Sequence, residues 1–260
     1  MKVYAVYRCL YGQDFAQASI RSIDGAVDKI FVFWDDTPWG DCDHVVYKGQ
    51  RVDFPKKFDE VLERIVALRN RKVVLAHDHM VNNQSQFTHL INDLVLPHYE
   101  RPDMVMVIEI DHVFRADQLQ LALGEAQAHR HSATRQIEVW KGLAHRVPER
   151  PSRPGVLFWN MHYVDRLPPT GRQADAPGWV MLRASVHNFG FAASESVMRW
   201  KHLTAMAFSA KINDSLPGES WLEEKWMKWT TEMRDLEISQ GAEHCIPCVV
   251  PYDPKELPPL

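Results

Sequence analysis

The first 130 residues alternate between two patterns of hydrophobic and polar positions. One is a short apolar run, which is typical of a buried strand, and the other places apolar residues three and four positions apart, which is typical of a helix with one buried face. Together they predict strands at 2–7, 29–34, 44–47 and 104–108, and helices after Asp14 and at about 57–70, 84–99 and 117–128. We expect Asp14 to cap its helix. This order predicts an α/β fold with a mostly parallel central sheet flanked by helices.

The pattern changes after about residue 130. The predicted elements of this second part are strands at 135–144, 155–163 and 179–191, helices at 195–209 and 218–235, and a proline-rich extended tail from 245. The helix at 218–235 is predicted because Leu222, Trp226 and Trp229 recur at helical intervals. We expect one domain in two halves, residues 1–130 and residues 131–260.

The most informative apolar run is Met104 to Ile108, because it ends in the acidic residues Glu109 and Asp111. Side chains two apart on a strand project to the same side, and ligands of α/β sheets bind beyond the carboxyl ends of the strands. Two carboxylates that point one way favour a divalent cation such as Mg²⁺ or Mn²⁺. Acidic residues also end strands simply because loops are solvated, and both interpretations stay open at this point.

Composition narrows the class of protein. The chain has 260 residues, 45% hydrophobic and 25% charged, with a formal charge of -4 and a pI near 6.3. These values are typical of a soluble globular protein and favour no nucleic-acid or anionic-membrane partner. The sequence shows no signal peptide and no apolar run of the roughly 20 residues that span a bilayer, so we expect a cytoplasmic protein without a transmembrane segment.

The four cysteines are too few and too scattered for a disulfide framework. Cys245 and Cys248, preceded by His244, are spaced like half of a zinc site. A matching second half is absent from the sequence, so reduced structural thiols are the simpler interpretation.

Four short motifs of the first half occur in a fixed order: Val6-Tyr7-Arg8 in the opening strand, Asp35-Asp36 after the second strand, Asn82-Asn83 before a helix, and Glu109-Ile110-Asp111. Each motif alone is common. Their order and spacing resemble the N-terminal half of GT-A nucleotide-sugar glycosyltransferases of the family 2 type, over roughly residues 2 to 120.

The resemblance implies a GT-A-like fold and the transfer of a sugar from a nucleotide-diphosphate donor, of the UDP or GDP type, to a carbohydrate or other hydroxyl acceptor. It implies a divalent Mn²⁺ or Mg²⁺ ion that compensates the diphosphate charge. The nucleotide-binding residues would be Tyr7, Arg8, Asp35, Asp36, Asn83 and Glu109.

Glutamate replaces the first aspartate of the usual motif, and His112 stands where an acidic residue frequently follows. Because Glu109 has the longer reach, it would either bind the metal through water or hold a ribose hydroxyl, and Asp111 is the stronger candidate for the metal ligand. His187 is a candidate second ligand. A histidine hydrogen-bonded at a strand end is the alternative interpretation of His187.

An inverting transferase also needs a base that takes the proton of the acceptor hydroxyl. The resemblance places this base at Glu219 in Gly218-Glu219-Ser220-Trp221, with Asp214 as the substitute. Glu219 would equally compensate the dipole of the helix that it begins. Trp221 is the candidate for stacking on an acceptor sugar, because it lies nearest the loop.

Two other functions remain open. His77 and His79 would share one face of a strand end and, with Asp35, Asp36 and Asp111, would suit a metal-dependent phosphoesterase or related hydrolase. The substituted Glu109 would instead suit a non-catalytic sugar-nucleotide-binding module. The nucleotide base, the donor sugar, the acceptor and the stereochemical course depend on a pocket shape that the loops set.

Overall fold

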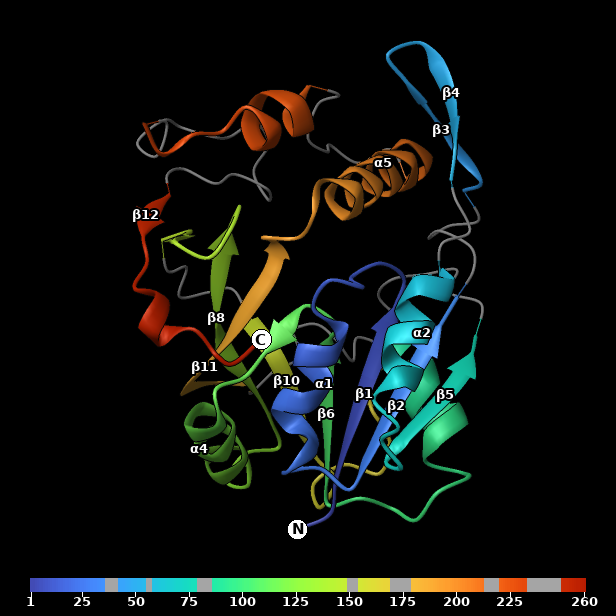
Figure 1. Cartoon of the computed structure of the whole chain (residues 1–260). Helices are drawn as coiled ribbons and strands as arrows, with labels where there is room; N and C mark the ends of the chain where they lie inside the picture. The colour runs from blue at the N-terminus through green and yellow to red at the C-terminus, as the bar shows by residue number, and fades with distance from the viewer. Residues whose placement is uncertain are drawn as a thin grey trace.

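The computed structural model describes residues 1–35, 42–54, 58–78, 86–148, 154–168, 179–212, 220–232 and 249–260. Its centre is a set of parallel strands in the order β6, β1, β2, β5 (Figure 1). Their bounds are β1 Val3–Cys9, β2 Lys29–Trp34, β5 Val73–His77 and β6 Met104–Glu109. The strands β1, β2 and β6 are almost continuously apolar because helices cover both of their faces, whereas the edge strand β5 is partly exposed.

One face of the sheet is covered by α1 (Ala16–Asp24), α2 (Phe58–Ala67) and α4 (Ala116–Ala126). Their apolar stripes pack on alternate side chains of the strands, such as Ala5 and Tyr7 of β1. The opposite face is covered by α3 (Gln86–His89) and the π-helix η1 (Leu90–Val95), which pack on the other set of side chains, such as Tyr4 and Val6. The layers are therefore helix, sheet and helix.

The second half of the chain extends the same sheet. β10 (Pro154–Asn160) pairs antiparallel with both β6 and β8 (His131–Trp140), and β11 (Val180–Phe191) pairs parallel with β8 and antiparallel with the short β7 (His112–Val113). At the outer edge lie β9 (His145–Arg146) and β12 (Val250–Pro251). One sheet of ten described strands thus contains strands from both halves.

Above the carboxyl ends of the strands lies α5 (Glu195–Ile212), which follows β11 almost directly (Figure 1). The second π-helix, η2 (Leu222–Met227), and the hairpin of β3 (His44–Tyr47) and β4 (Gln50–Asp53) pack near it. A 3-10 turn, η4 (Pro254–Glu256), lies in the C-terminal segment. Helix α5, η2 and the β3–β4 hairpin together form a roof over the carboxyl ends of the strands.

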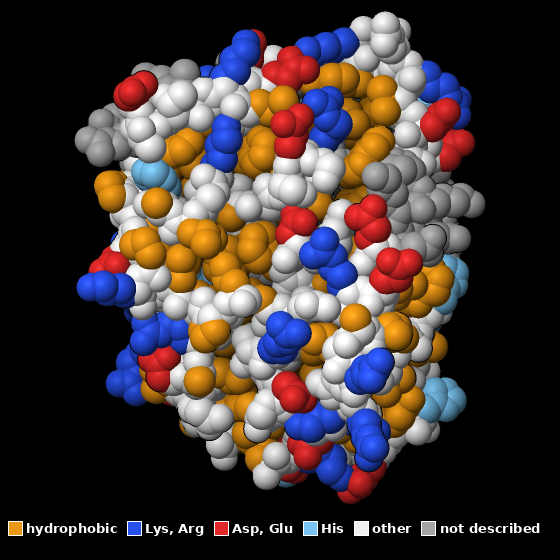
Figure 2. Space-filling model, in the orientation of Figure 1, with side chains coloured by type: hydrophobic (Ala, Val, Ile, Leu, Met, Phe, Trp, Pro, Cys, Tyr) orange, Lys and Arg blue, Asp and Glu red, His pale blue; other side chains and the backbone are white. Residues whose placement is uncertain are grey.

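The predicted fold class is confirmed, because the sheet is mostly parallel at its centre and flanked by helices. None of the helices in the described part of the chain combines the length and hydropathy of a membrane span. On the face shown in Figure 2, basic and acidic side chains are interspersed, in agreement with the nearly neutral composition.

Two local predictions were wrong, and one strand was missed. Asp14 does not cap α1; its Oδ2 accepts a hydrogen bond from the backbone N of Ser194 at 2.7 Å instead. Strand β4 was not predicted. In the structure it pairs with β3 through a two-residue hairpin turn, in which Lys48 and Gly49 adopt the positive φ values of 51° and 75° that such a turn requires.

The helix predicted at 218–235 is much shorter in its described part, where η2 ends at Met227. Its end is held by Lys141, whose Nζ donates to the carbonyl oxygens of Trp226 at 2.7 Å and Trp229 at 3.3 Å. Lys141, from the bend after β8, thus donates to carbonyls that a continuing helix would have bonded itself. The tryptophan spacing reflects packing on Trp140, which lies 6.3 Å from Trp229 between ring centroids.

Candidate functional site

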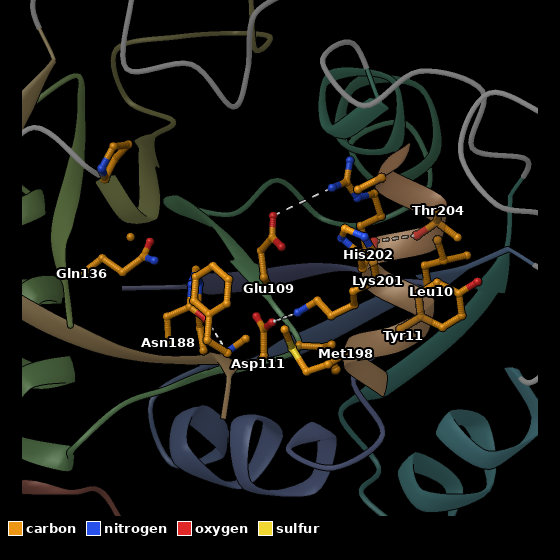
Figure 3. A pocket seen from close by; sticks show the side chains of 18 of the residues that line it. Leu10, Tyr11, Glu109, Asp111, Gln136, Asn188, Met198, Lys201, His202 and Thr204 are labelled. Carbon is orange, nitrogen blue, oxygen red and sulfur yellow. Dashed lines mark hydrogen bonds and ion pairs between the residues drawn. The ribbon is translucent and has the colours of Figure 1, made fainter. Parts of the chain in front are cut away.

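A cavity of about 480 Å³ opens at the carboxyl ends of β1 and β6, beneath α5 (Figure 3). Its walls come from the end of β1, the turn after β6, the strands β8, β10 and β11, helix α5, and Trp221 just before η2. This is the edge at which α/β sheets bind ligands. Its volume lies within the range of small-molecule sites.

Both members of the acidic pair line this cavity. Glu109 is the last residue of β6, and Asp111 lies in the turn between β6 and β7; their side chains enter the cavity next to each other (Figure 3). Glu109 faces Arg8 on the neighbouring strand, where the two residues are in register and Oε1 is 3.8 Å from Nη2. The Arg8 side chain is buried and its guanidinium lies over the ring of Phe87 at 5.2 Å. Arg8 is thus held in a fixed position.

Asp111 is held by a second cation. Its side chain is 10% exposed, and its Oδ2 accepts a hydrogen bond from Nζ of Lys201 at 2.7 Å. Burial by itself raises the pKa of Asp111, but the charges of Lys201 and His112 and the hydrogen bond from Lys201 bring that pKa below its ordinary value. Asp111 is therefore ionised at neutral pH and paired with an ammonium group.

The backbone is packed closely around this ion pair. The backbone N of Phe189 donates to the Asp111 carbonyl at 2.9 Å, which ties the turn to β11. A Cβ atom at Gly190 would lie 2.9 Å from Oδ2 of Asp111 and 3.2 Å from Nζ of Lys201. It would also lie 2.9 Å from Oδ1 of Asn188, which accepts a hydrogen bond from the Gly190 N. A larger residue at this position would force the ends of these three side chains to shift, because β11 passes so near the pair.

The far wall of the cavity is aromatic. Trp221 lines the cavity but is only 7% exposed, because its ring packs on Phe191, His202 and Trp140 at centroid distances of 6.2, 5.8 and 6.5 Å. The stacking of Trp221 on an acceptor sugar stays a prediction.

Three predicted site residues are not part of the described cavity lining. Tyr7 is buried in the core, where its hydroxyl lies 3.1 Å from Oγ of Ser19 and burial raises its pKa. Asp35 is buried at the end of β2. For these two residues the predicted nucleotide contact has no support from their positions.

His187 is the third. His187 makes a hydrogen bond, which is the alternative to metal binding, because its Nε2 lies 2.6 Å from the hydroxyl of Tyr252. Burial, aided by Arg115 and Arg146, lowers the pKa of His187 to about 4. Its neighbour Asn188 lines the cavity instead, as expected because adjacent residues of a strand face opposite sides.

Several predicted residues lie outside the described ranges. These are Asp36, His79, Asn82, Asn83, Asp214, Glu219, His244, Cys245 and Cys248.

Sequence reasoning missed Lys201, Asn188 and Gly190. Lys201 is an ordinary lysine of a predicted helix, and it is separated from Asp111 by 90 positions in the chain. On the strand that carries Asn188 and Gly190, the sequence analysis identified His187 as a candidate ligand but neither of these two neighbours.

The described residues do not form a divalent-metal site. Within the described ranges, no three side chains among His, Cys, Asp and Glu converge on one point. A Mg²⁺ ion would lie about 2.1 Å from a carboxylate oxygen, and Oδ2 of Asp111 already holds the Lys201 ammonium at 2.7 Å. A Mg²⁺ ion bound to Oδ2 would therefore lie close to the Lys201 ammonium and be repelled by it.

No protein-family model and no curated protein matches the chain. Among solved structures, it is similar to TarS of S. aureus in complex with UDP-GlcNAc (TM-score 0.45, 11% identity, 90% of this chain and 78% of that one). It is similar to the mannosyltransferase PcManGT of Pyrobaculum calidifontis in complex with GDP-Man and Mn²⁺ (0.44, 8%, 84% and 66%).

A third similar structure is the 4-diphosphocytidyl-2C-methyl-D-erythritol synthase of Anaerococcus prevotii (TM-score 0.44, 8% identity, 82% of this chain and 99% of that one). The matches thus include a mannosyltransferase and a synthase of a different name. At these TM-scores and identities the comparisons assign no function.

Proposed function

We propose that this protein is a nucleotide-sugar-dependent glycosyltransferase that binds the donor diphosphate in the cavity at the ends of β1 and β6. The observation that carries the proposal is the meeting of two carboxylates, Glu109 and Asp111, with two cations, Arg8 and Lys201, in one cavity of about 480 Å³. The motif residues Arg8, Glu109 and Asp111, on which the sequence resemblance rests, all line this cavity.

The proposed roles follow from the chemistry of transfer. The bond between the anomeric carbon and the diphosphate oxygen breaks, so negative charge grows on the diphosphate and must be compensated. Arg8 and Lys201 supply positive charge at the cavity wall, and Glu109 supplies an acceptor for a ribose hydroxyl. The acceptor oxygen forms the new bond, and its proton passes to a base, for which Glu219 remains the candidate and Asp214 the substitute.

The Mn²⁺ or Mg²⁺ ion predicted from the sequence has no ligand set among the described residues, so none of these roles depends on it. The donor is of the UDP or GDP type, and the acceptor is a carbohydrate or another hydroxyl compound.

Binding of nucleotides tests the proposal. UDP, GDP, UDP-GlcNAc and GDP-Man are titrated into the protein by calorimetry, and transfer or hydrolysis of the labelled sugar is followed by chromatography. We expect one nucleotide to bind and Arg8→Met to weaken it about tenfold to a hundredfold, because a hydrogen bond to a charged group contributes about 1.5–3 kcal/mol. Lys72→Met is the control, since Lys72 lies far from the cavity beside Asp24.

The alternatives give different results in the same assays. A phosphoesterase would release phosphate from p-nitrophenyl phosphate without needing a sugar acceptor. A binding module would bind nucleotide and never cleave the donor. Absence of binding by all four compounds, or equal binding by wild type and Arg8→Met, would refute the proposal.

A further inference from the structure

We propose that the ammonium of Lys201 occupies the position at Asp111 that a divalent cation would take, so that the donor diphosphate binds without a metal ion. This inference rests on the proposed function for the identity of the ligand. The occupation of the cation position itself rests only on the geometry of the cavity.

The first step is the contact between the two groups. Nζ of Lys201 lies 2.7 Å from Oδ2 of Asp111, and that carboxylate is 10% exposed. An ionised carboxylate buried to this degree needs a partner, because an unpaired charge in a protein interior is costly. Lys201 of helix α5 is that partner, so Asp111 needs no cation from solution.

The second step is the space around the contact. Gly190 lies so near that a single added carbon would be 2.9 Å from Oδ2 and 3.2 Å from Nζ. The amide oxygen of Asn188 closes the same side, 2.9 Å from that carbon position. A metal ion with its shell of six or more oxygen ligands would have to displace Lys201 from this packing.

The third step is the charge that a diphosphate would meet. The carboxylates Glu109 and Asp111 are each paired with a cation, Arg8 and Lys201, so neither carboxylate presents an uncompensated negative charge to a diphosphate. An ammonium has three N–H donors, and Asp111 accepts one of them. The Lys201 side chain is 34% exposed, so its ammonium can bridge Asp111 and a phosphate oxygen, as a metal ion would.

Two arms of one experiment test the inference. In the first arm, Mn²⁺ is titrated into the metal-free protein and the free ion is measured by electron paramagnetic resonance. We expect the wild type and Asp111→Asn to give the same Mn²⁺ titration, because Asp111 holds no Mn²⁺ in the wild type. We expect Lys201→Met to gain a Mn²⁺ site, because this change frees the Asp111 carboxylate. Thermal unfolding shows that each variant is folded, and Lys201→Arg, which keeps the charge, is expected to bind no Mn²⁺.

In the second arm, UDP and GDP are titrated with EDTA and then with Mn²⁺. We expect the wild-type Kd to be the same in both conditions, within about twofold. Lys201→Met is expected to weaken binding about tenfold to a hundredfold in EDTA and to recover part of that loss when Mn²⁺ is added. Lys72→Met is expected to behave like the wild type.

The outcomes separate the inference from the proposed function. A Mn²⁺ site in the wild type that Asp111→Asn abolishes would overturn the inference, as would wild-type nucleotide binding that requires Mn²⁺. If neither nucleotide binds under any condition, the proposed function fails, while the first arm still decides whether Lys201 occupies the cation position. A folded Lys201→Met variant that gains no Mn²⁺ binding would also overturn the inference.

Discussion

Replacement of His187 by glutamine should flatten the dependence of stability on pH. His187 is 2% exposed, and its Nε2 lies 2.6 Å from the hydroxyl of Tyr252. The charges that act on His187 are Arg115 at the start of α4 and Arg146 on β9, whose guanidinium lies 5.6 Å from the centre of the Tyr252 ring. Tyr252 also faces the carboxylates of Glu256 and Asp253. Burial and these two positive charges all disfavour protonation, so the pKa of His187 falls from 6.5 to about 4.

The sign and size of the effect follow from this difference. The unfolded chain takes up a proton on His187 near pH 6.5, whereas the folded protein does so only near pH 4. The stability that His187 contributes is therefore complete above pH 6.5 and is lost as the pH falls toward 4. Because one pKa unit corresponds to about 1.4 kcal/mol, the loss is about 2 kcal/mol by pH 5 and about 3 kcal/mol by pH 4.

Urea unfolding at pH 7, 6 and 5 measures this difference. We expect the wild type to lose about 2 kcal/mol more than His187→Gln between pH 7 and pH 5. Tyr252→Phe should cost about 1 kcal/mol at every pH and keep the slope, because burial is the main cause of the lowered pKa. The exposed His98, changed to glutamine, is the control. Equal slopes for wild type and His187→Gln would refute the reasoning.

Two further substitutions test the packing of the site and its roof. Gly190→Ala should lower the free energy of unfolding by about 1–3 kcal/mol and weaken nucleotide binding, because its Cβ would contact the side chains of Asp111 and Lys201. Gly25→Ala, which has open space around it, is the control and should change the stability by less than about 1 kcal/mol in the same urea titration. Lys141→Met should cost about 2–3 kcal/mol, because three carbonyl oxygens near the end of η2 lose the bond from Nζ, and the Trp226 oxygen keeps a long backbone bond from the N of Trp229 at 3.4 Å. A loss below about 0.5 kcal/mol in thermal unfolding would contradict this.

Local patterns predicted the elements of the first half well. The strand predicted at 29–34 and the one predicted at 44–47 coincide with β2 and β3, and the acidic strand coincides with β6 apart from its last residue. These elements depend on burial and backbone hydrogen bonding within short segments, which hydrophobic periodicity records. The end of η2 could not be predicted in this way, because Lys141 lies 85 positions away from Trp226.

The candidate site was predicted in part for the same reason. Arg8, Glu109, Asp111 and Trp221 line the cavity, whereas Tyr7, Asp35 and His187 are not in its described lining. A strand pattern places Tyr7 and Arg8 on opposite faces, yet which face borders the cavity depends on the elements that cover the sheet. His187 and Asn188 differ in the same way.

The sequence by itself determined a mostly parallel sheet with carboxylates at the end of its central strand, because side-chain alternation and apolar runs are local properties of a chain. The tertiary structure alone decided that Lys201 is the partner of Asp111. That pairing requires β11 to run beside the turn after β6 and α5 to fold back over the strand ends, and the free energy of a buried ion pair depends on such packing rather than on any local pattern.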